Sequence, residues 1–333
     1  MARKKLFTEE TLKKFLKKDQ RSLIEISQHF DVSINDINNI LVNLKSNKYN
    51  IKEENSIITL STDLNKGITG HSLDPRMWEG DWFRFGFTSD NHLGNVHSRL
   101  DVVHTLYDLF QKEGIKIVYN GGNMIDGEHR FNKNELVDEA HGMTKQVKYL
   151  AVNFPYRKDI TTQFVAGDDH EGWYVQREGI DIGEYMVQIR ESLGRNDFIY
   201  LGYAEANIAL SDPDQSHKSY IRLVHPGGGS AYATSYAMQK LAESYQGGEK
   251  PTVVLAGHYH KYDVCYPREI HMVQMGTTCD QTLFMRKRKI QAMIGGGFVE
   301  MHRAPNGSIN RFKVEWCPFY DKKFYMGKDL YLR

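Results

Sequence analysis

The chain has 333 residues, 40% of them hydrophobic and 12% aromatic, so it can bury a sizeable core and is neither disordered nor fibrous. Its 43 Lys and Arg residues balance 42 Asp and Glu residues at a net charge of +1, which excludes a whole-chain attraction to nucleic acid or to an anionic membrane. No stretch approaches the roughly 20 apolar residues of a membrane span, and we expect a soluble, cytoplasmic protein without a membrane partner. The three cysteines, Cys265, Cys279 and Cys317, lack the spacing of a disulfide framework or of a thiolate zinc site.

Residues 1–62 predict a small domain of three short helices followed by a β-hairpin. In the segment 22–30 (SLIEISQHF), Leu23, Ile26 and Phe30 share one helical face, and Ser22 with Glu25 forms a capping box. After the break at residues 31–33, a second helix is expected to pack its own apolar stripe against the first. This stripe consists of Ile34, Ile37, Leu41 and Leu44. Residues 49–60 contain two short β-prone runs, as in the wing of a winged helix. The whole pattern indicates a helix-turn-helix or winged-helix-like domain.

Polar side chains on the outer face of the second helix are the candidate DNA contacts. They are Asn35, Asn38, Asn39 and Lys45. Lysines of the first helix could contact phosphate groups. The alternative is that this domain docks another protein or is merely structural, because helical periodicity only reports a core. Of these interpretations we expect DNA binding, so DNA is the expected partner. An oligomer is possible but not indicated.

Residues 63–80 are rich in turn formers and are expected to link this domain to a larger one at 81–333. From residue 81 onward, short β-type runs each end where a polar or glycine-containing loop begins. They span 82–88, 115–120, 160–165, 198–201, 220–225 and 252–257. This alternation with helical segments predicts an α/β layered domain that carries its functional groups at the strand ends.

Five of these loops hold carboxylate and imidazole side chains. Their sequences are SDNH at 89–92, GNMIDG at 122–127, GDDHE at 167–171, HPGGG at 225–229 and GHYH at 257–260. In an extended loop, residues two apart point the same way, so Asp90 with His92, and His258 with His260, are expected to face one cavity. Carboxylate and imidazole together suit manganese, iron or zinc.

In this order the five loops resemble the signature of the calcineurin-like metallophosphoesterases, which runs DxH, GDxxDxG, GNH[ED], H and GHxH. The resemblance covers about residues 82–265, and each motif follows a β-type run, which a chance match would not require. It implies a four-layer sandwich that binds two divalent metal ions, with Mn²⁺ expected and Fe, Zn, Ni or Mg as alternatives. A water activated by these metals would attack a phosphate ester.

Carried over position by position, the resemblance assigns most of the candidate site residues. Asp90, His92 and His260 would hold the first metal, and Asp169, His225 and His258 the second. Asn123 occupies the position that bridges both metals. His170 falls at the family's catalytic histidine, and Asp126 is expected to orient a neighbour. His129 and Arg130, which follow the second motif, could reach a substrate phosphate or be plain surface.

Two positions depart from this signature. Asn123 stands where the family has Asp, and a neutral amide cannot neutralise two dications, so weak metal binding and low activity are expected. We hypothesise that Asn123 is an engineered, inactivating Asp→Asn change. Asp169 stands where the family usually has Asn, and its negative charge could partly offset the one missing at Asn123.

Three functions remain open from the sequence. The leading hypothesis is a metal-dependent DNA nuclease or phosphodiesterase, because a fused nucleic-acid-binding domain concentrates the site on that polymer. The second is a small-molecule phosphatase or cyclic-nucleotide phosphodiesterase whose helical domain serves regulation or oligomerisation. If Asn123 is natural, the third is an inactive module that binds nucleic acid or a nucleotide. A compact fusion of this type would suit a phage or a bacterium.

Overall fold

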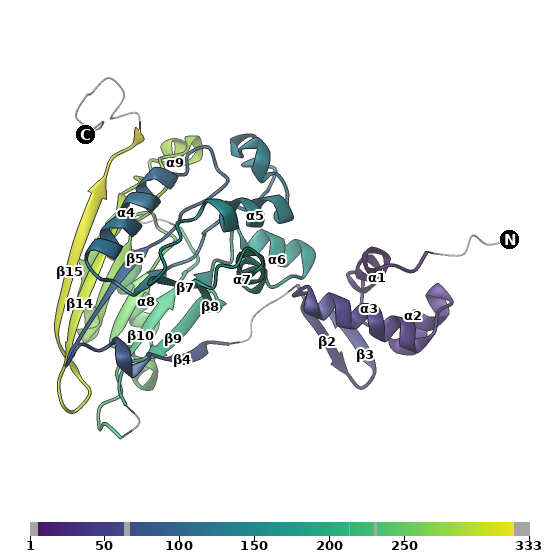
Figure 1. Cartoon of the computed structure of the whole chain (residues 1–333), viewed down its shortest axis with the longest axis horizontal. Helices are drawn as coiled ribbons and strands as arrows, with labels where there is room; N and C mark the ends of the chain where they lie inside the picture. The colour runs from purple at the N-terminus through teal and green to yellow at the C-terminus, as the bar shows by residue number, and fades with distance from the viewer. Residues whose placement is uncertain (1–5, 63–66, 213, 230–231, 323–333) are drawn as a thin grey trace.

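The computed structural model describes residues 6–62, 67–212, 214–229 and 232–322. A small domain at the N-terminal end lies beside a large layered domain (Figure 1). Within these described ranges, no helix combines the length and the apolar character that crossing a membrane requires.

The small domain contains three helices and a three-stranded sheet. Its elements in chain order are α1 (Glu9–Leu16), β1 (Arg21–Ser22), α2 (Leu23–Phe30), α3 (Ile34–Ser46), β2 (Ile51–Glu54) and β3 (Ile57–Leu60). Strand β3 pairs with β1 on one side and with β2 on the other. The turn between β2 and β3 has positive φ angles at Asn55 (52°) and Ser56 (64°), the geometry that joins two twisted strands through two residues. The expected helices and hairpin are present, and the structure adds the short strand β1.

The structure tests two expectations for α2 and α3, the capping box at Ser22 and the packing of their apolar faces. The capping box is confirmed, because Glu25 N donates to Ser22 Oγ (3.2 Å) and Ser22 N donates to Glu25 Oε2 (2.7 Å). The prediction for Ile34 is wrong, because this side chain is 45% exposed. Ile34 is the first residue of α3 and precedes by one turn Ile37, which is the first residue of that helix to reach the core.

Two six-stranded sheets make up the large domain. The first has the order β15-β14-β5-β6-β7-β8 and consists of β5 (Trp82–Thr88), β6 (Ile117–Asn120), β7 (Thr161–Ala166), β8 (Phe198–Tyr203), β14 (Ile294–Arg303) and β15 (Ile309–Phe319). The second has the order β12-β13-β11-β10-β9-β4 and consists of β4 (Thr69–Ser72), β9 (Glu205–Ala209), β10 (Tyr220–Val224), β11 (Val253–Ala256), β12 (Tyr262–Cys265) and β13 (His271–Met275). Strands β5 to β8 are parallel neighbours, and so are β10, β11 and β13. Parallel neighbours place their carboxyl ends at one edge of a sheet, where ligands bind in such folds.

The two sheets face each other and are covered by helices on their outer sides. Phe85 and Val299 of the first sheet share a buried cluster with Ile221 and Leu255 of the second. The outer face of the first sheet is covered by α4 (Leu100–Lys112), α5 (Met143–Asn153), α6 (Gly172–Glu178) and α7 (Ile182–Ser192). The outer face of the second is covered by α8 (Tyr236–Ser244), and a short α9 (Leu283–Arg288) precedes β14. The result is a layered α/β domain in the order helices, sheet, sheet, helix.

The six predicted strands correspond to β5, β6, β7, β8, β10 and β11. Part of the segment expected to be a linker is instead a strand, because residues 69–72 form β4 and pair with β9. This edge strand has no apolar alternation, and it is held by main-chain bonds and by His71 Nε2, which lies 2.6 Å from Leu201 O. Residues 63–66 of the expected linker lie outside the described residues.

Main-chain hydrogen bonds join the small domain to the large one. Asn50 N donates to Gly179 O (2.7 Å), and Asp181 N donates to Lys48 O (2.8 Å). Lys17 Nζ adds a bond to Arg177 O (2.6 Å) at the end of α6. Since α6 begins directly after the GDDHE loop, the small domain is anchored at the far end of a helix that starts at the candidate site.

The buried ion pair of Arg190 and Asp197 gives a test of how the helical layer is held. Arg190 is fully buried, and its guanidinium donates to both carboxylate oxygens of Asp197 at 2.8 and 2.7 Å. It also donates to the carbonyl oxygens of Ala151, Phe154 and Pro155, at the end of α5. Arg190→Met is expected to lower the free energy of unfolding by about 3–5 kcal/mol, because Asp197 would be left buried and unpaired.

Guanidinium denaturation followed by circular dichroism measures this loss. Arg157→Met is the control, because Arg157 pairs at 2.6 Å with Asp108, whose side chain is 66% exposed. The control should change the free energy of unfolding by less than about 1 kcal/mol. Equal losses in the two variants would contradict the assignment of a structural role to the buried pair.

Candidate metal centre

The five predicted loops meet at the carboxyl ends of strands from both sheets. Those after β5, β6 and β7 come from the first sheet, and those after β10 and β11 from the second. Glycine lets the two sets approach, because a Cβ atom at Gly257 would collide with Ser89 Oγ and with the carbonyl oxygen of Gly121. The loops are also bonded to each other directly, as His258 N donates to Asp90 Oδ2 (2.8 Å).

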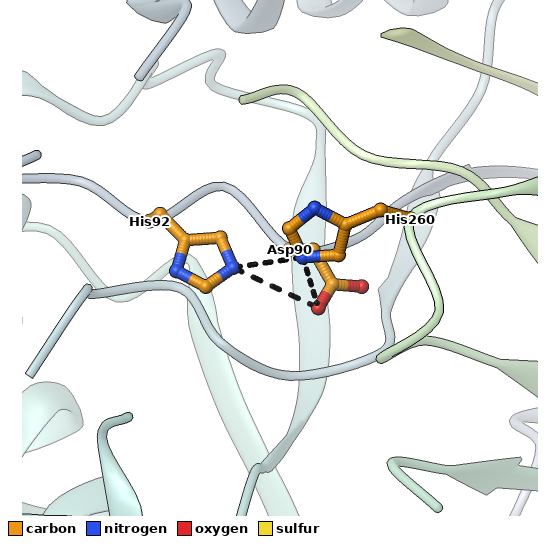
Figure 2. Close-up of side chains that lie close together, drawn as sticks. All are labelled: Asp90, His92 and His260. Atoms are coloured by element: carbon orange, nitrogen blue, oxygen red, sulfur yellow. Dashed lines mark hydrogen bonds and ion pairs between the residues drawn. The ribbon is translucent and has the colours of Figure 1, made fainter. Parts of the chain in front are cut away.

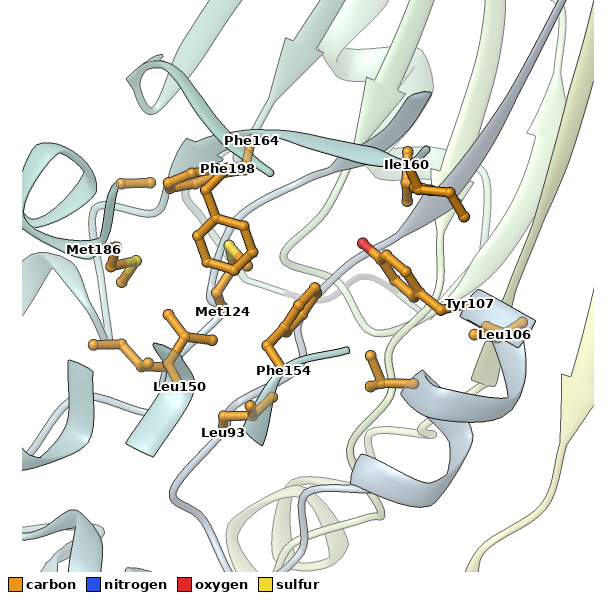
Figure 3. Packing of buried hydrophobic residues seen from close by; sticks show 14 of the residues in the cluster. Leu93, Leu106, Tyr107, Met124, Leu150, Phe154, Ile160, Phe164, Met186 and Phe198 are labelled. Atoms are coloured by element: carbon orange, nitrogen blue, oxygen red, sulfur yellow. The ribbon is translucent and has the colours of Figure 1, made fainter. Parts of the chain in front are cut away.

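Buried apolar residues anchor these loops from below. Leu93 follows His92, and Met124 follows Asn123, and both side chains are fully buried in the cluster shown in Figure 3. Leu93 N donates to Met124 O (2.9 Å), so the first two loops are fixed to each other directly beside the candidate ligands. The site therefore rests on the packed core rather than on a mobile surface.

Six of the site residues have left-handed backbone conformations. Their φ angles are 49° at Asp90, 47° at His92, 52° at Asn123, 46° at His170, 75° at His258 and 55° at His260. Residues with a side chain rarely adopt this region, which costs on the order of 1–3 kcal/mol each and is found where function requires it. The expectation that these loops are extended is therefore wrong. The side chains converge because each one leaves a tight turn, not because alternate residues share a face.

The first cluster contains Asp90, His92 and His260, which point toward one another in Figure 2. His92 Nε2 lies 3.1 Å from His260 Nε2, and Asp90 Oδ1 lies 3.4 Å from His260 Nε2 and 3.9 Å from His92 Nε2. Ligand atoms about 2.0–2.2 Å from one cation lie roughly 3–3.5 Å from each other. The spacing of the three atoms therefore suits a shared metal ion.

The second cluster contains Asp169, His225 and His258. Asp169 Oδ1 lies 3.3 Å from His225 Nε2, and Asp169 Oδ2 lies 3.5 Å from His258 Nδ1. His258 and His260 thus belong to different clusters, as the resemblance implies, although they are separated by one residue.

Three of the histidines are oriented by a bond from the ring nitrogen that faces away from the cluster. These contacts join His92 Nδ1 to Asp126 Oδ1 (2.8 Å), His225 Nδ1 to Gly121 O (2.6 Å) and His258 Nε2 to Gly228 O (2.6 Å). An acceptor at the second nitrogen is the usual support of a metal-binding histidine, because it fixes the tautomer and the ring plane. The nitrogen left over in each ring is the one that faces the cluster.

Asn123 lies between the two clusters. The main-chain carbonyl oxygen of Asn123 accepts from His92 N (2.9 Å), and its side-chain Nδ2 donates to Asp169 Oδ1 (3.2 Å). The buried atoms without a hydrogen bond include three at this site, Asn123 Oδ1, Asp90 Oδ1 and His225 Nε2, and His260 Nδ1 beside them. Buried polar atoms are normally paired, so the gathering of these atoms at one site fits a place where cations bind. Oxygen and imidazole donors in this number fit two divalent cations.

The charges of the first cluster are set by burial and by neighbouring rings. Burial, together with the nearby His170, lowers the pKa of His92 to about 4, which keeps its imidazole in the neutral form that binds metals. Burial opposes ionisation of Asp90, but His260 and the other imidazoles outweigh it and lower the pKa of this carboxyl. The first cluster thus presents one carboxylate and a neutral ring at His92.

Asp126 holds the candidate catalytic histidine beside the first cluster. His170 Nδ1 lies 2.9 Å from Asp126 O and 3.4 Å from Asp126 Oδ1, the oxygen that also contacts His92. Asn95 and Asn132, which the sequence did not single out, donate to the other oxygen at 2.9 and 2.6 Å. Burial opposes protonation of His170, but the contacts with Asp126 raise its pKa to about 9. Asp126 also forms a third group of possible ligand atoms with His92 and His170, and its assignment as an orienting residue rather than a metal ligand stays a prediction.

Glu171 is a further site residue to which the sequence assigned no role. Its side chain is fully buried, and it accepts from Gly167 N (2.6 Å), Asn123 N (2.8 Å) and Met124 N (3.0 Å). Burial raises the pKa of Glu171 to about 7, while the N–H groups of Gly167 and Asn123 and the nearby His225 act in the opposite direction. The only sequence signal for it is its place at the end of the GDDHE motif.

The remaining candidates lie outside the clusters. His129 and Arg130 follow Asp126 on the same loop, and Arg130 is exposed. Asn35, Asn38, Asn39 and Lys45 are exposed on α3 of the small domain, where Lys45 pairs with Glu53 at 3.5 Å.

No protein-family model matches the sequence, and no curated protein matches it. Similar solved structures include an archaeal phosphodiesterase, with a TM-score of 0.36 and 12% identity, covering 71% of this chain and 100% of that one. A 5′-nucleotidase precursor from Thermus thermophilus has a TM-score of 0.36 and 12% identity, covering 74% of this chain and 57% of its own. Zinc-complexed Vps29 from Entamoeba histolytica has a TM-score of 0.30 and 10% identity, covering 71% and 99%. At such scores no property of these proteins is carried over to this chain.

A Mn²⁺ titration by calorimetry tests the two clusters. The chain is expected to bind one ion tightly and a second ion more weakly, because Asn123 leaves the shared position neutral. His260→Ala and His258→Ala are each expected to lose one of these two ions, because each variant removes a donor from a different cluster. His302→Ala is the matched control, since His302 contacts Asn310 on β15 and belongs to neither cluster. Two ions retained in both cluster variants would contradict the assignment.

Proposed function

We propose that the chain is a two-metal phosphoesterase whose substrate is DNA. The observation that carries this proposal is the pair of three-residue clusters on either side of Asn123, at strand ends contributed by both sheets. The order of the motifs along the chain, resembling the metallophosphoesterase signature, agrees with that arrangement. The left-handed backbone at four of the cluster residues and at Asn123 is independent support, because strain of this kind gathers at functional sites.

The two clusters would hold the cations, and Asn123, whose amide contacts Asp169, lies between the clusters. When bound, the cations supply positive charge to the phosphoryl oxygens and activate water at neutral pH. The role of His170 follows from its support. Because its Nδ1 is held by Asp126, the other ring nitrogen is left for the substrate, and its side chain is 29% exposed. In this position a protonated imidazole can stabilise developing charge or protonate the leaving oxygen.

The small domain is the basis for proposing DNA. The outer face of α3 exposes Asn35, Asn38 and Asn39, and asparagine is a side chain that reads adenine edges in the major groove. A DNA-binding domain anchored at the far end of α6 would raise the local concentration of DNA near the site. This support comes from the position and chemistry of the residues.

Asn123 favours a second candidate, a domain that binds phosphate without cutting it. A neutral bridge leaves two cations insufficiently neutralised, which would reduce metal occupancy and turnover. If Asn123 is the native residue, binding rather than hydrolysis becomes the better description.

Hydrolysis assays of the chain and of Asn123→Asp distinguish these candidates. Each protein is incubated with Mn²⁺ and a labelled DNA duplex, a single-stranded DNA or a generic phosphodiester. We expect Asn123→Asp to bind Mn²⁺ roughly 10- to 100-fold more tightly and to cut DNA, since the restored carboxylate would neutralise both cations. Cutting by the Asp form alone would mark Asn123 as the inactivating change.

Other results of the same assay argue against the proposal. Turnover of the small ester without any cutting of DNA would make the nuclease assignment untenable. No hydrolysis of any substrate and no gain in metal occupancy would favour the binding domain.

Binding of the full chain to a DNA duplex tests the small domain. Replacing Asn35, Asn38 and Asn39 by Ala is expected to weaken binding by roughly tenfold or more, because each good base contact contributes about 1–3 kcal/mol. Fluorescence anisotropy over a range of salt concentrations measures this, and affinity should fall as salt rises. Asn47→Ala, an exposed change at the end of the same helix, is the control. An unchanged affinity in the triple variant would exclude this face of α3 as the DNA contact.

A further inference from the structure

A series of aromatic rings leads from the candidate catalytic histidine to the surface. Trp173 stacks on His170 with ring centroids 4.7 Å apart and an interplanar angle of 29°. His129 lies 5.2 Å from Trp173, and Phe131 lies 4.4 Å from His129. His129 and Phe131 belong to the loop after β6, His170 belongs to the loop after β7, and Trp173 lies in the first turn of α6, which follows that loop. Phe131 is thus connected to the reacting centre by continuous ring contacts.

Phe131 is the outermost ring of this series and is 74% exposed. The Arg130 guanidinium lies 4.9 Å from the centroid of the same ring, so a cation and an aromatic face are presented together. Exposing a phenyl ring forgoes the roughly 1.5–3 kcal/mol that burial of such a side chain contributes. A single exposed aromatic residue is common on protein surfaces. This one differs because it extends the ring series that begins at His170.

The loop that carries Phe131 is held in place by its buried neighbour Asn132. Asn132 Nδ2 donates to Asp126 Oδ2 (2.6 Å), and Asn132 Oδ1 accepts from His129 N (2.8 Å). Lys133 N donates to His129 O (3.0 Å), which closes the turn around Phe131. The carboxylate that orients His92 and His170 therefore also fixes the loop beneath the exposed ring. A ring fixed in this way can stack a ligand without the cost of ordering it first.

We infer that the exposed face of Phe131 stacks an unpaired nucleobase next to the phosphate that His170 faces, and that Arg130 contacts a neighbouring phosphate. This inference rests on the proposed function and specifies its substrate as single-stranded DNA or a frayed end. A fixed aromatic face beside a guanidinium matches the two parts of a nucleotide, the base and the phosphate. Every base has a flat face, so stacking of this kind tolerates any sequence, but it requires a base that is not stacked inside a duplex.

Two labelled single strands test this with the full chain in the presence of Mn²⁺. One carries 2-aminopurine, a base whose fluorescence is quenched when it stacks, and the other has the same length and charge but contains abasic sites. Phe131→Ala removes the ring, and Phe131→Trp keeps an aromatic face. Tyr266→Ala is the matched control, because Tyr266 is an aromatic residue that is also largely exposed (58%). Its ring centroid lies 4.5 Å from that of His271, which pairs with the first residue of β11. The candidate site, with His258, lies at the other end of that strand.

We expect Phe131→Ala to weaken binding of the 2-aminopurine strand by roughly 5- to 150-fold and to abolish its quenching. Phe131→Trp and Tyr266→Ala should retain both affinity and quenching. Binding of the abasic strand should be equally weak in the chain and in Phe131→Ala. Mn²⁺ uptake by each variant, measured as above, shows that the site itself is intact.

The remaining outcomes separate failure of this inference from failure of the proposed function. If both strands bind equally well and Phe131→Ala changes neither, base stacking is overturned while a phosphate-binding site remains. If neither strand binds although Mn²⁺ is taken up, both the inference and the DNA assignment are overturned. Equal losses in Phe131→Ala and Tyr266→Ala would show a general surface effect and would also overturn the inference.

Discussion

The site depends on one buried carboxylate, that of Glu171, which bonds the backbone of two loops at once. It accepts from Gly167 N at the end of β7 and from Asn123 N and Met124 N after β6. These N–H groups belong to turns that leave the strand ladder, so no strand carbonyl is available to them, and an unpaired buried N–H is costly. Without Glu171 these three N–H groups would lose their acceptor, and the two loops would be left with the contacts of Asn123 with Asp169 and of Asp126 with His170. The left-handed conformation of Asn123 is therefore stabilised by a residue that does not belong to either cluster.

Strain and polarity concentrate at this one edge of the domain for a common reason. The sheets supply parallel strands that end together, and the turns that follow must reverse direction within one or two residues to bring side chains inward. Left-handed backbone at Asp90, His92 and His260 is the result, and the first cluster forms because the loops after β5 and β11 both turn these side chains toward the same point. The packed core beneath, including Leu93 and Met124, provides the stability that offsets this local cost.

The sequence predicted features that depend on residues close together in the chain. It did not predict strand pairing or contacts between segments that are distant in the chain. The resemblance of the five motifs assigned six residues to two sets, each of which the structure brings together, and the capping box at Ser22 was found from side chains three residues apart. Strand β4 was missed because its pattern shows no alternation and its partner, β9, is distant in sequence. The roles of Glu171 and Asn132 were missed because their partners are backbone atoms and a carboxylate whose positions only the folded loops define. Local patterns cannot report such contacts.

The contact between Asn123 and Asp169 bears on how far an amide at the bridging position weakens the attraction of the site for cations. In the resembled signature the bridging residue is Asp and the residue of the second metal is Asn, whereas this chain has the reverse. The number of carboxylates among the candidate metal ligands is therefore unchanged. Because Asn123 Nδ2 donates to Asp169 Oδ1 at 3.2 Å, the carboxylate of Asp169 lies directly beside the bridging position. If the two clusters hold cations, the second cluster would attract its cation more strongly, and the shared position would lack the charge that screens the two cations from each other. The exchange thus preserves the overall charge of the site while favouring one strongly held ion over two equally held ones.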